Sequence, residues 1–388
     1  MSKQVKTPRF YVDMVSFLHA TGDLDWNGSK GGAELLYMNP SNPYIRESTT
    51  THVIFKIGKN TNRSPKTSFG INFAAVLNHN LASDDSGFKI NGIRGFATNG
   101  DDSDWENLTS GTNFGDSVLN SNWSSGRINT DYNGTSIFTL SDTIEGYWRQ
   151  FDVRYDGDDT LDLEYNHQLG SLVVGKYFDC PNSPDLNLTM SRRFDGIKKQ
   201  KTIGGKTLPS IYYDGPVEWE MNGPDGTYKY PPFELDLATG IPDLITDDED
   251  TPDIDESNLA AVIADFNQRA KSGLGRKGLR SWKLTFSYIS EDNMWMDNEV
   301  SSKVTSDSID DGEIPTGGSD PNPMLSDDSF NFVWNCTLGG SLPFIFQPDN
   351  TNNNPDQFSI CTFRDSSLSV KQVAFNTYSL SITIDEVA

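Results

Sequence analysis

The side chains that could carry out chemistry in this sequence are carboxylates and a few isolated histidines. The four histidines, His19, His52, His79 and His167, lie far apart, and none is four residues from another, as helical zinc sites require. The sequence contains no nucleophile elbow, no Walker loop and no dinucleotide fingerprint. A glycosidase carboxylate pair would leave little trace in a sequence, yet the Asp residues fall in turn-rich segments, where solubility explains them. We therefore expect a protein that is not an enzyme and that uses no cofactor.

One acidic turn carries oxygen ligands at a spacing that resembles a calcium site. Asp156, Asp158 and Asp162 lie close together in a segment that also contains glycine and threonine. The segment lacks the glutamate that closes an EF-hand loop. A tight acidic turn is the favoured interpretation, and a metal site at these three residues is the weaker alternative.

Five further residues are candidates for binding sugar or contacting another protein: Asn78, His79, Asn80, Trp105 and Trp123. The first three follow a strand-like run and would lie at the rim of a β-sandwich. The two tryptophans belong to a polar stretch, residues 98–135, which we expect to be a long loop that its aromatic residues hold in place. The competing interpretations are that the Asn and His side chains satisfy loop carbonyls at a strand end, and that the tryptophans only anchor the loop.

The net charge of the chain argues against some classes of binding partner. Its 388 residues include 31 Lys and Arg against 55 Asp and Glu, for a formal net charge of −24. Such a field repels phosphate backbones and anionic lipid, so we expect no nucleic-acid partner. No apolar run approaches the roughly 18 residues of a membrane-spanning helix, and the first residues lack the apolar core of a signal peptide. We therefore expect no membrane span and synthesis in a cytoplasm.

Three cysteines, Cys180, Cys336 and Cys361, cannot all pair with one another, and their spacing matches no zinc or redox motif. We expect them to be reduced and buried.

The distribution of apolar residues predicts a mainly β protein with two domains. Short apolar runs between Gly, Asn and Asp turns favour a jelly-roll-like β-sandwich in residues 1–178. Alternation of Phe10, Val12 and Met14 predicts that the first strand runs through Met14. Further strands are predicted at 52–57, 68–77, 87–93, 136–140, 147–155 and 172–177.

Residues 179–388 are predicted to form a β-barrel or β-sandwich domain. Strands are expected at 280–288, 330–335, 344–346 and 378–384. An acidic insertion, about residues 217–275, interrupts this domain. It contains the single predicted helix, which begins near Ser257 or Asn258, has apolar residues at helical spacing and stops at Gly273.

Several segments of the chain resemble structural proteins of tailed bacteriophages. The runs at 7–12, 73–81, 147–149 and 172–177 resemble the jelly-roll segment of such proteins. The segments 183–186 and 194–198, together with Gly204-Gly205, are similar to segments of marine and cyanobacterial phage virion proteins. The C-terminal half, from Trp282 through 343–349 to 378–384, resembles β-barrel domains built on the plan of the tail tube.

This resemblance implies a structural component of the virion, in the tail or baseplate, made in the cytoplasm of a bacterial host. Its partners would be other copies of itself and other virion proteins. Two alternatives stay open: a carbohydrate-binding module that recognises a host surface glycan, and a decoration protein of the capsid.

Overall fold

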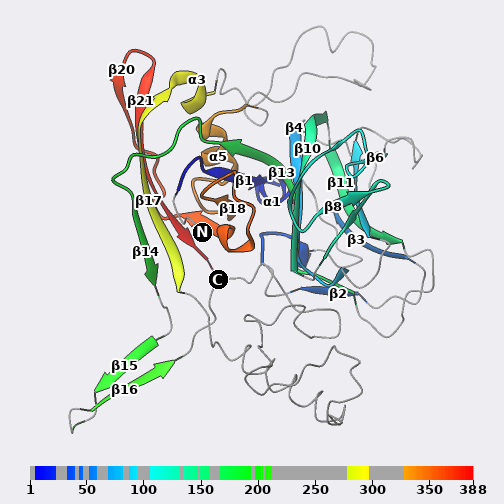
Figure 1. Ribbon diagram of the computed structural model, residues 1–388, viewed down its shortest axis with the longest axis horizontal. Coiled ribbons are helices and arrows are strands. Elements are labelled where there is room, and N and C mark those ends of the chain that lie inside the picture. Colours follow the sequence, from blue (N-terminus) through cyan, green and yellow to red (C-terminus); the bar gives the residue numbers. More distant parts are fainter. Residues whose placement is uncertain are drawn as a thin grey trace, which may run out of the picture.

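The computed structural model has a mainly β architecture, as the sequence predicts (Figure 1). It describes residues 5–22, 33–39, 43–46, 52–58, 69–81, 87–94, 105–131, 134–146, 148–156, 167–193, 197–201, 203, 206–211, 278–296 and 327–387. Within these residues, no helix is long and apolar enough to cross a membrane.

Eight strands of the N-terminal half form two sheets with the order of a jelly roll. They are β1 (Arg9–Asp13), β3 (His52–Gly58), β4 (Phe69–His79), β5 (Phe88–Arg94), β9 (Arg127–Asn129), β10 (Gly134–Gly146), β11 (Trp148–Asp156) and β13 (Ser171–Asp179). One sheet contains the order β1-β13-β4-β10 and the other β3-β11-β5-β9. Counted one to eight along the chain, these orders are 1-8-3-6 and 2-7-4-5, which interleave as in two Greek keys.

The two jelly-roll sheets share one apolar core. Phe69 and Ile71 of β4 and Phe88 of β5 are completely buried in the same cluster of side chains. The indole N–H of Trp148 on β11 donates to the carbonyl of Phe69 across the two layers, at 3.2 Å. Because apolar residues face inward on both sheets, the alternation of apolar residues in the sequence predicted these strands.

Short strands extend this core structure. β7 (Phe114–Leu119) pairs with β10, β6 (Trp105–Asn107) pairs with β5, and β8 (Asn122–Ser124) pairs with β9. β2 (Tyr44–Arg46) and β12 (His167–Leu169) form a separate pair. The prediction of one long loop from 98 to 135 was therefore wrong for residues 105–129. These strands are three to six residues long and mostly polar, so their pairing comes from neighbouring strands and leaves no apolar alternation in the sequence.

The C-terminal half continues the larger jelly-roll sheet. β18 (Phe344–Gln347) pairs with β1, and β19 (Ser359–Phe363), β21 (Thr377–Glu386), β17 (Leu279–Ser290) and β14 (Thr189–Arg193) follow in that order. β20 (Val370–Ala374) pairs with β21 outside this path. A separate hairpin consists of β15 (Ile197–Lys201) and β16 (Thr207–Ile211). The predicted domain boundary between residues 178 and 179 stays a prediction. In the structure, one continuous sheet contains strands from both sides of this boundary.

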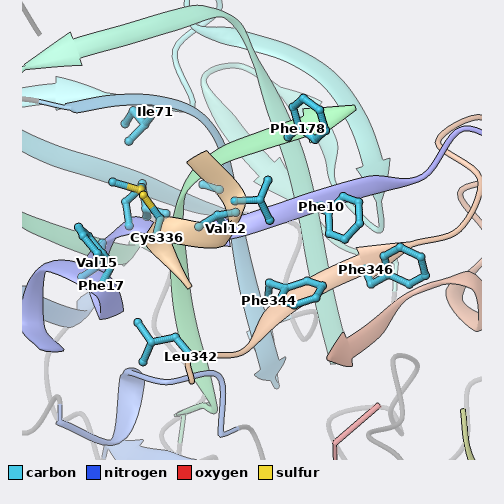
Figure 2. Packing of buried hydrophobic residues seen from close by; sticks show 14 of the residues in the cluster. Phe10, Val12, Val15, Phe17, Ile71, Phe178, Cys336, Leu342, Phe344 and Phe346 are labelled. Carbon is cyan, nitrogen blue, oxygen red and sulfur yellow. The ribbon is translucent and has the colours of Figure 1, made fainter. Parts of the chain in front are cut away.

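Phe10 on β1 occupies the centre of the core where the two halves meet (Figure 2). It is completely buried, and its register partners are Phe178 on β13 and Phe346 on β18. Its ring centroid lies 5.2 Å from that of Phe346 and 5.5 Å from that of Phe344. Phe330 packs edge-on against it at 5.8 Å. Aromatic contacts at these distances add to the stabilisation from buried area.

A short helix, α1 (Met14–Thr21), replaces the predicted continuation of the first strand. Asp13 ends β1 and caps the helix, since its carboxylate accepts hydrogen bonds from the amides of Val15 and Ser16. Gly22 follows the helix in the left-handed region, with φ of 77°. The alternation of Phe10, Val12 and Met14 fits both a strand and the strand-to-helix junction, and the Asp cap decides between them.

A second helix, α5 (Phe330–Cys336), lies where the sequence predicted a strand. Phe330 and Val333 are three residues apart and both buried, while Phe330 contacts Phe10, Phe178 and Phe363. An aromatic run of this length satisfies a period of two and a period of 3.6 equally well. Packing over the phenylalanines of β1 and β13 selects the helix.

The remaining helical segments are short: α3 (Glu291–Met294) and the 3-10 turns η1 (Ala33–Leu35) and η6 (Pro355–Gln357). The helix predicted near residues 257–270, like the acidic insertion at 217–275, lies outside the described residues. All three cysteines are buried free thiols, as predicted, and burial raises the pKa of each.

Phe10→Ala tests whether the two halves depend on one core. We expect the free energy of unfolding to fall by about 3–5 kcal/mol, because the substitution leaves a cavity among well-packed rings. Both halves should lose stability in one transition when unfolding is followed by tryptophan fluorescence and by circular dichroism. Leu186→Ala, at a residue whose side chain is fully exposed, is the control and should change the free energy by no more than about 0.5 kcal/mol. Two separate transitions in the Phe10 variant would contradict the shared core.

Candidate interaction surface

The structure places His79 in the interior and not at an exposed rim. Its side chain is fully buried at the end of β4. The amide of Leu81 donates to Nδ1 at 3.3 Å, so the ring proton is on Nε2 and points to the Ser136 hydroxyl at 2.8 Å. Burial lowers the pKa of His79 to about 3. This neutral imidazole binds a backbone amide and a hydroxyl at the end of β4, which is a structural role.

The neighbouring asparagines form the turn itself. Asn78 has a left-handed backbone with φ of 49°, which asparagine tolerates better than most residues. Both Asn78 and Asn80 are half-buried and both have interaction partners within the fold. The amide of Gly170 donates to the carbonyl of Asn78 at 3.1 Å, which ties this turn to the start of β13.

Trp123 lies on β8, in the other sheet from His79, and holds its polar surroundings in place. Its indole N–H donates to the carbonyl of Thr109 at 2.9 Å, and its ring stacks on Phe114 at 6.0 Å. The side chain is still 42% exposed. Trp105 lies on β6 opposite Ile93. The structure therefore assigns an anchoring role to Trp123, whose side chain is partly exposed, whereas that of His79 is buried.

Only one of the three residues of the predicted calcium site lies in the described part of the chain. Asp156 is the last residue of β11, while Asp158 and Asp162 lie outside the described residues. In the part of the chain that is described, no group of three or more His, Cys, Asp or Glu side chains could hold a metal ion.

One surface that is open to a partner in the described chain lies on β14, the strand at one edge of the large sheet. In the described chain β14 is the end strand of this sheet and pairs with β17 on one side. All five of its residues are exposed, including Met190 at 41%. An edge strand with both faces in solvent offers backbone groups and side chains to another chain. Thr189–Arg193 was not among the predicted strands, because Met190 is its only apolar residue and the segment shows no apolar alternation.

A rigid arrangement of side chains supports this end of the sheet. Arg280 of β17 binds Glu386 of β21, with Nη2 2.8 Å from Oε1. The same guanidinium donates to the carbonyls of Asp356 and Phe358 at 2.6 Å. Arg280 lies opposite Arg192 of β14 in the register. Because both members of the ion pair are largely buried and fully hydrogen-bonded, β17 presents β14 in a defined position.

The hairpin β15–β16 lies beyond the lower end of β14 and apart from both sheets (Figure 1). Residues 189–211, here called the arm, comprise β14 and this hairpin. They contain six basic residues, Arg192, Arg193, Lys198, Lys199, Lys201 and Lys206, and one acidic residue, Asp195, for a net charge of +5. At the turn of the hairpin Ile203 is fully exposed. The arm is thus cationic on a chain whose total charge is −24.

A second exposed apolar region lies at the upper end of the same sheet, around the β20–β21 turn and α3 (Figure 1). Here Phe375 is 88% exposed and Tyr288 73% exposed, with Val373 beside the turn also exposed. Glu291 and Asp292 of α3 are exposed too. These five residues are called the tip. The amide of Glu291 donates to the carbonyl of Asn376 at 3.1 Å, so α3 and the turn form one surface.

No family model matches this chain, and no curated protein or solved structure is significantly similar to it.

The buried imidazole predicts a pH dependence of stability. In the folded state His79 stays neutral down to about pH 3, whereas in the unfolded chain it binds a proton near pH 6.5. The unfolded state therefore holds the extra proton between these values, and stability falls as the pH falls, by up to about 1.4 kcal/mol per unit. In His79→Gln the free energy of unfolding should fall less steeply between pH 6.5 and 4.5, as measured by urea titration.

Ser136→Ala is the control for this experiment. It removes the hydroxyl that faces Nε2 but keeps the buried imidazole, so the steep pH dependence should persist even if the absolute stability drops. Equal slopes in the wild type and His79→Gln would show that this histidine is not a buried neutral group.

Proposed function

We propose that this chain is a structural subunit of a tailed-bacteriophage virion, in the tail or baseplate, that assembles through protein–protein contacts. The observation that carries the proposal is the position of two exposed surfaces on one sheet. The arm, with the edge strand β14, lies at the start of β17, and the aromatic tip lies at the end of β17. The virion assignment comes from the resemblance of the sequence to phage structural proteins. A jelly roll alone would not support it, since that fold serves many functions.

Exposed apolar side chains at hairpin turns support an assembly role. Turns between strands ordinarily use Gly, Asn or Asp, and Phe375 and Ile203 are large apolar residues at such turns. Leaving them in water forgoes about 25 cal/mol for each Å² that a partner would bury. Large exposed apolar groups rimmed by polar residues are typical of interaction sites.

The overall charge suits a subunit that must stay dispersed before it assembles. A net charge of −24 makes identical chains repel one another as their surfaces approach. At contact distance, specific patches decide whether chains join, because surface charges are screened beyond about 8–10 Å in physiological salt.

Two measurements test this function. The purified chain should form multimers of defined symmetry in sedimentation velocity as its concentration rises from about 1 to 100 μM, the range of moderate affinity. An antibody to the chain should label the tails of intact particles in electron micrographs. Labelling of the capsid would favour the decoration hypothesis instead, and a monomer that binds glycan arrays would favour the carbohydrate hypothesis. Either result would contradict the proposal.

Met190→Lys tests the edge strand directly. A lysine on an edge strand opposes strand addition, so we expect self-association to weaken at least about tenfold, or about 1.4 kcal/mol, with an unchanged midpoint of thermal unfolding. Thr112→Lys introduces the same side chain at an exposed turn of the jelly roll and should leave association unchanged. Equal association in the two variants would remove β14 from the contact surface.

A further inference from the structure

We propose that copies of this chain join head to tail, with the arm of one copy docked on the tip of the next. The proposal deepens the assembly function above and rests on it. It commits to one occupant for each surface: a second copy of this chain.

The charges of the two surfaces are complementary. The arm has a net charge of +5, so the rest of the chain, without it, carries −29. Lys201 and Lys206 of the arm are exposed, and Glu291 and Asp292 of the tip are exposed as well, against one exposed lysine of β20, Lys371. Asp185 lies next to the tip, where it accepts a hydrogen bond from Ser287. A cationic arm on an anionic chain is attracted to the body of another copy rather than repelled by it.

Apolar side chains accompany the charges on both surfaces. Exposed pairs of opposite charge contribute little by themselves, about 0–1 kcal/mol each. Ile203 in the arm, and Phe375 and Tyr288 in the tip, supply the area whose burial would stabilise the contact. Aromatic residues at the centre of a contact with charges around them are the usual arrangement of a binding hot spot.

The geometry prevents the arm from reaching the tip of its own chain. β14 pairs with Leu279–Lys283 at the start of β17, whereas α3 follows directly after Ser290 at the end of β17. β17 has 12 residues, which corresponds to about 40 Å at 3.3 Å per residue. Figure 1 shows the hairpin and the tip at opposite ends of this sheet. A contact between two different surfaces of identical subunits is heterologous and builds a ring or a filament.

A charge exchange tests the docking in solution. Lys201→Glu with Lys206→Glu, and separately Glu291→Lys with Asp292→Lys, should each weaken self-association about tenfold or more in sedimentation velocity. The variant that carries all four substitutions should recover association, because the two signs are exchanged together. The control is Asp116→Lys with Asp142→Lys, which makes the same charge change as the Glu291 and Asp292 variant. Both residues are exposed and lie on β7 and β10, at the opposite edge of the sheet from β14. This control should not weaken association.

A disulfide experiment tests the contact itself. The three native cysteines are buried, so introduced thiols report alone. A mixture of the Ile203→Cys and Phe375→Cys proteins, mildly oxidised, should yield a disulfide-linked dimer that contains one chain of each. A mixture of Ile203→Cys with Asp142→Cys should not. If the arm instead binds the acidic insertion of its own chain, about residues 217–275, no dimer will form between the first two proteins, and the proposal fails.

Different results would contradict head-to-tail docking and the assembly function. Wild-type multimers that are insensitive to the charge exchange, with no Ile203 to Phe375 cross-link, would overturn head-to-tail docking and leave the assembly function standing. A wild-type chain that stays monomeric at every concentration and is absent from particles would overturn both.

Discussion

The pairing of β1 on both of its edges is the constraint on which the rest of the structure depends. Residues 9–13 pair with β13 on one side and residues 9–12 pair with β18 on the other. Arg9 binds Asp179 of β13 through two contacts of 2.7 Å, and the Tyr11 hydroxyl donates to Gln347 of β18 at 2.8 Å. Phe10, between them, contributes the ring around which both halves pack. A five-residue strand near the start of the chain thus joins β13, which ends at Asp179, to β18, which begins at Phe344.

This junction explains the position of the contact surfaces. Because β18 adds to the free edge of the jelly-roll sheet, the C-terminal strands extend outward from it, and the sheet ends at β14. The length of β17 separates the arm, which lies at the start of this strand, from the tip, which lies at its end. A rigid sheet with different surfaces at its ends is well suited to repeated contact between identical chains. The proposed assembly function and the proposed head-to-tail docking both rest on this single arrangement.

Buried polar side chains and exposed apolar side chains have different roles in this protein. Buried polar groups such as His79, Arg280 and Gln347 have hydrogen-bond partners and fix strand ends and strand pairs. Among the exposed large apolar residues, Phe375 and Ile203 lie at hairpin turns and Met190 lies on the edge strand β14. Apolar residues at such positions gain no burial within the described chain, whereas the buried polar groups stabilise its fold.

Local sequence determined the mainly β class, most strands of the jelly roll and the burial of the cysteines, because alternation of apolar residues reflects a property of each strand alone. Tertiary structure decided the rest. Residues 330–336 became a helix because they pack over Phe10, and residues 105–129 became strands because their neighbours offered hydrogen bonds. His79 proved to be an interior residue, since its surroundings come from β10 and β5, far away in sequence. Which strand lies at an edge, and which charges lie at opposite ends of a sheet, depends on strand order, and strand order arises only from contacts between distant segments.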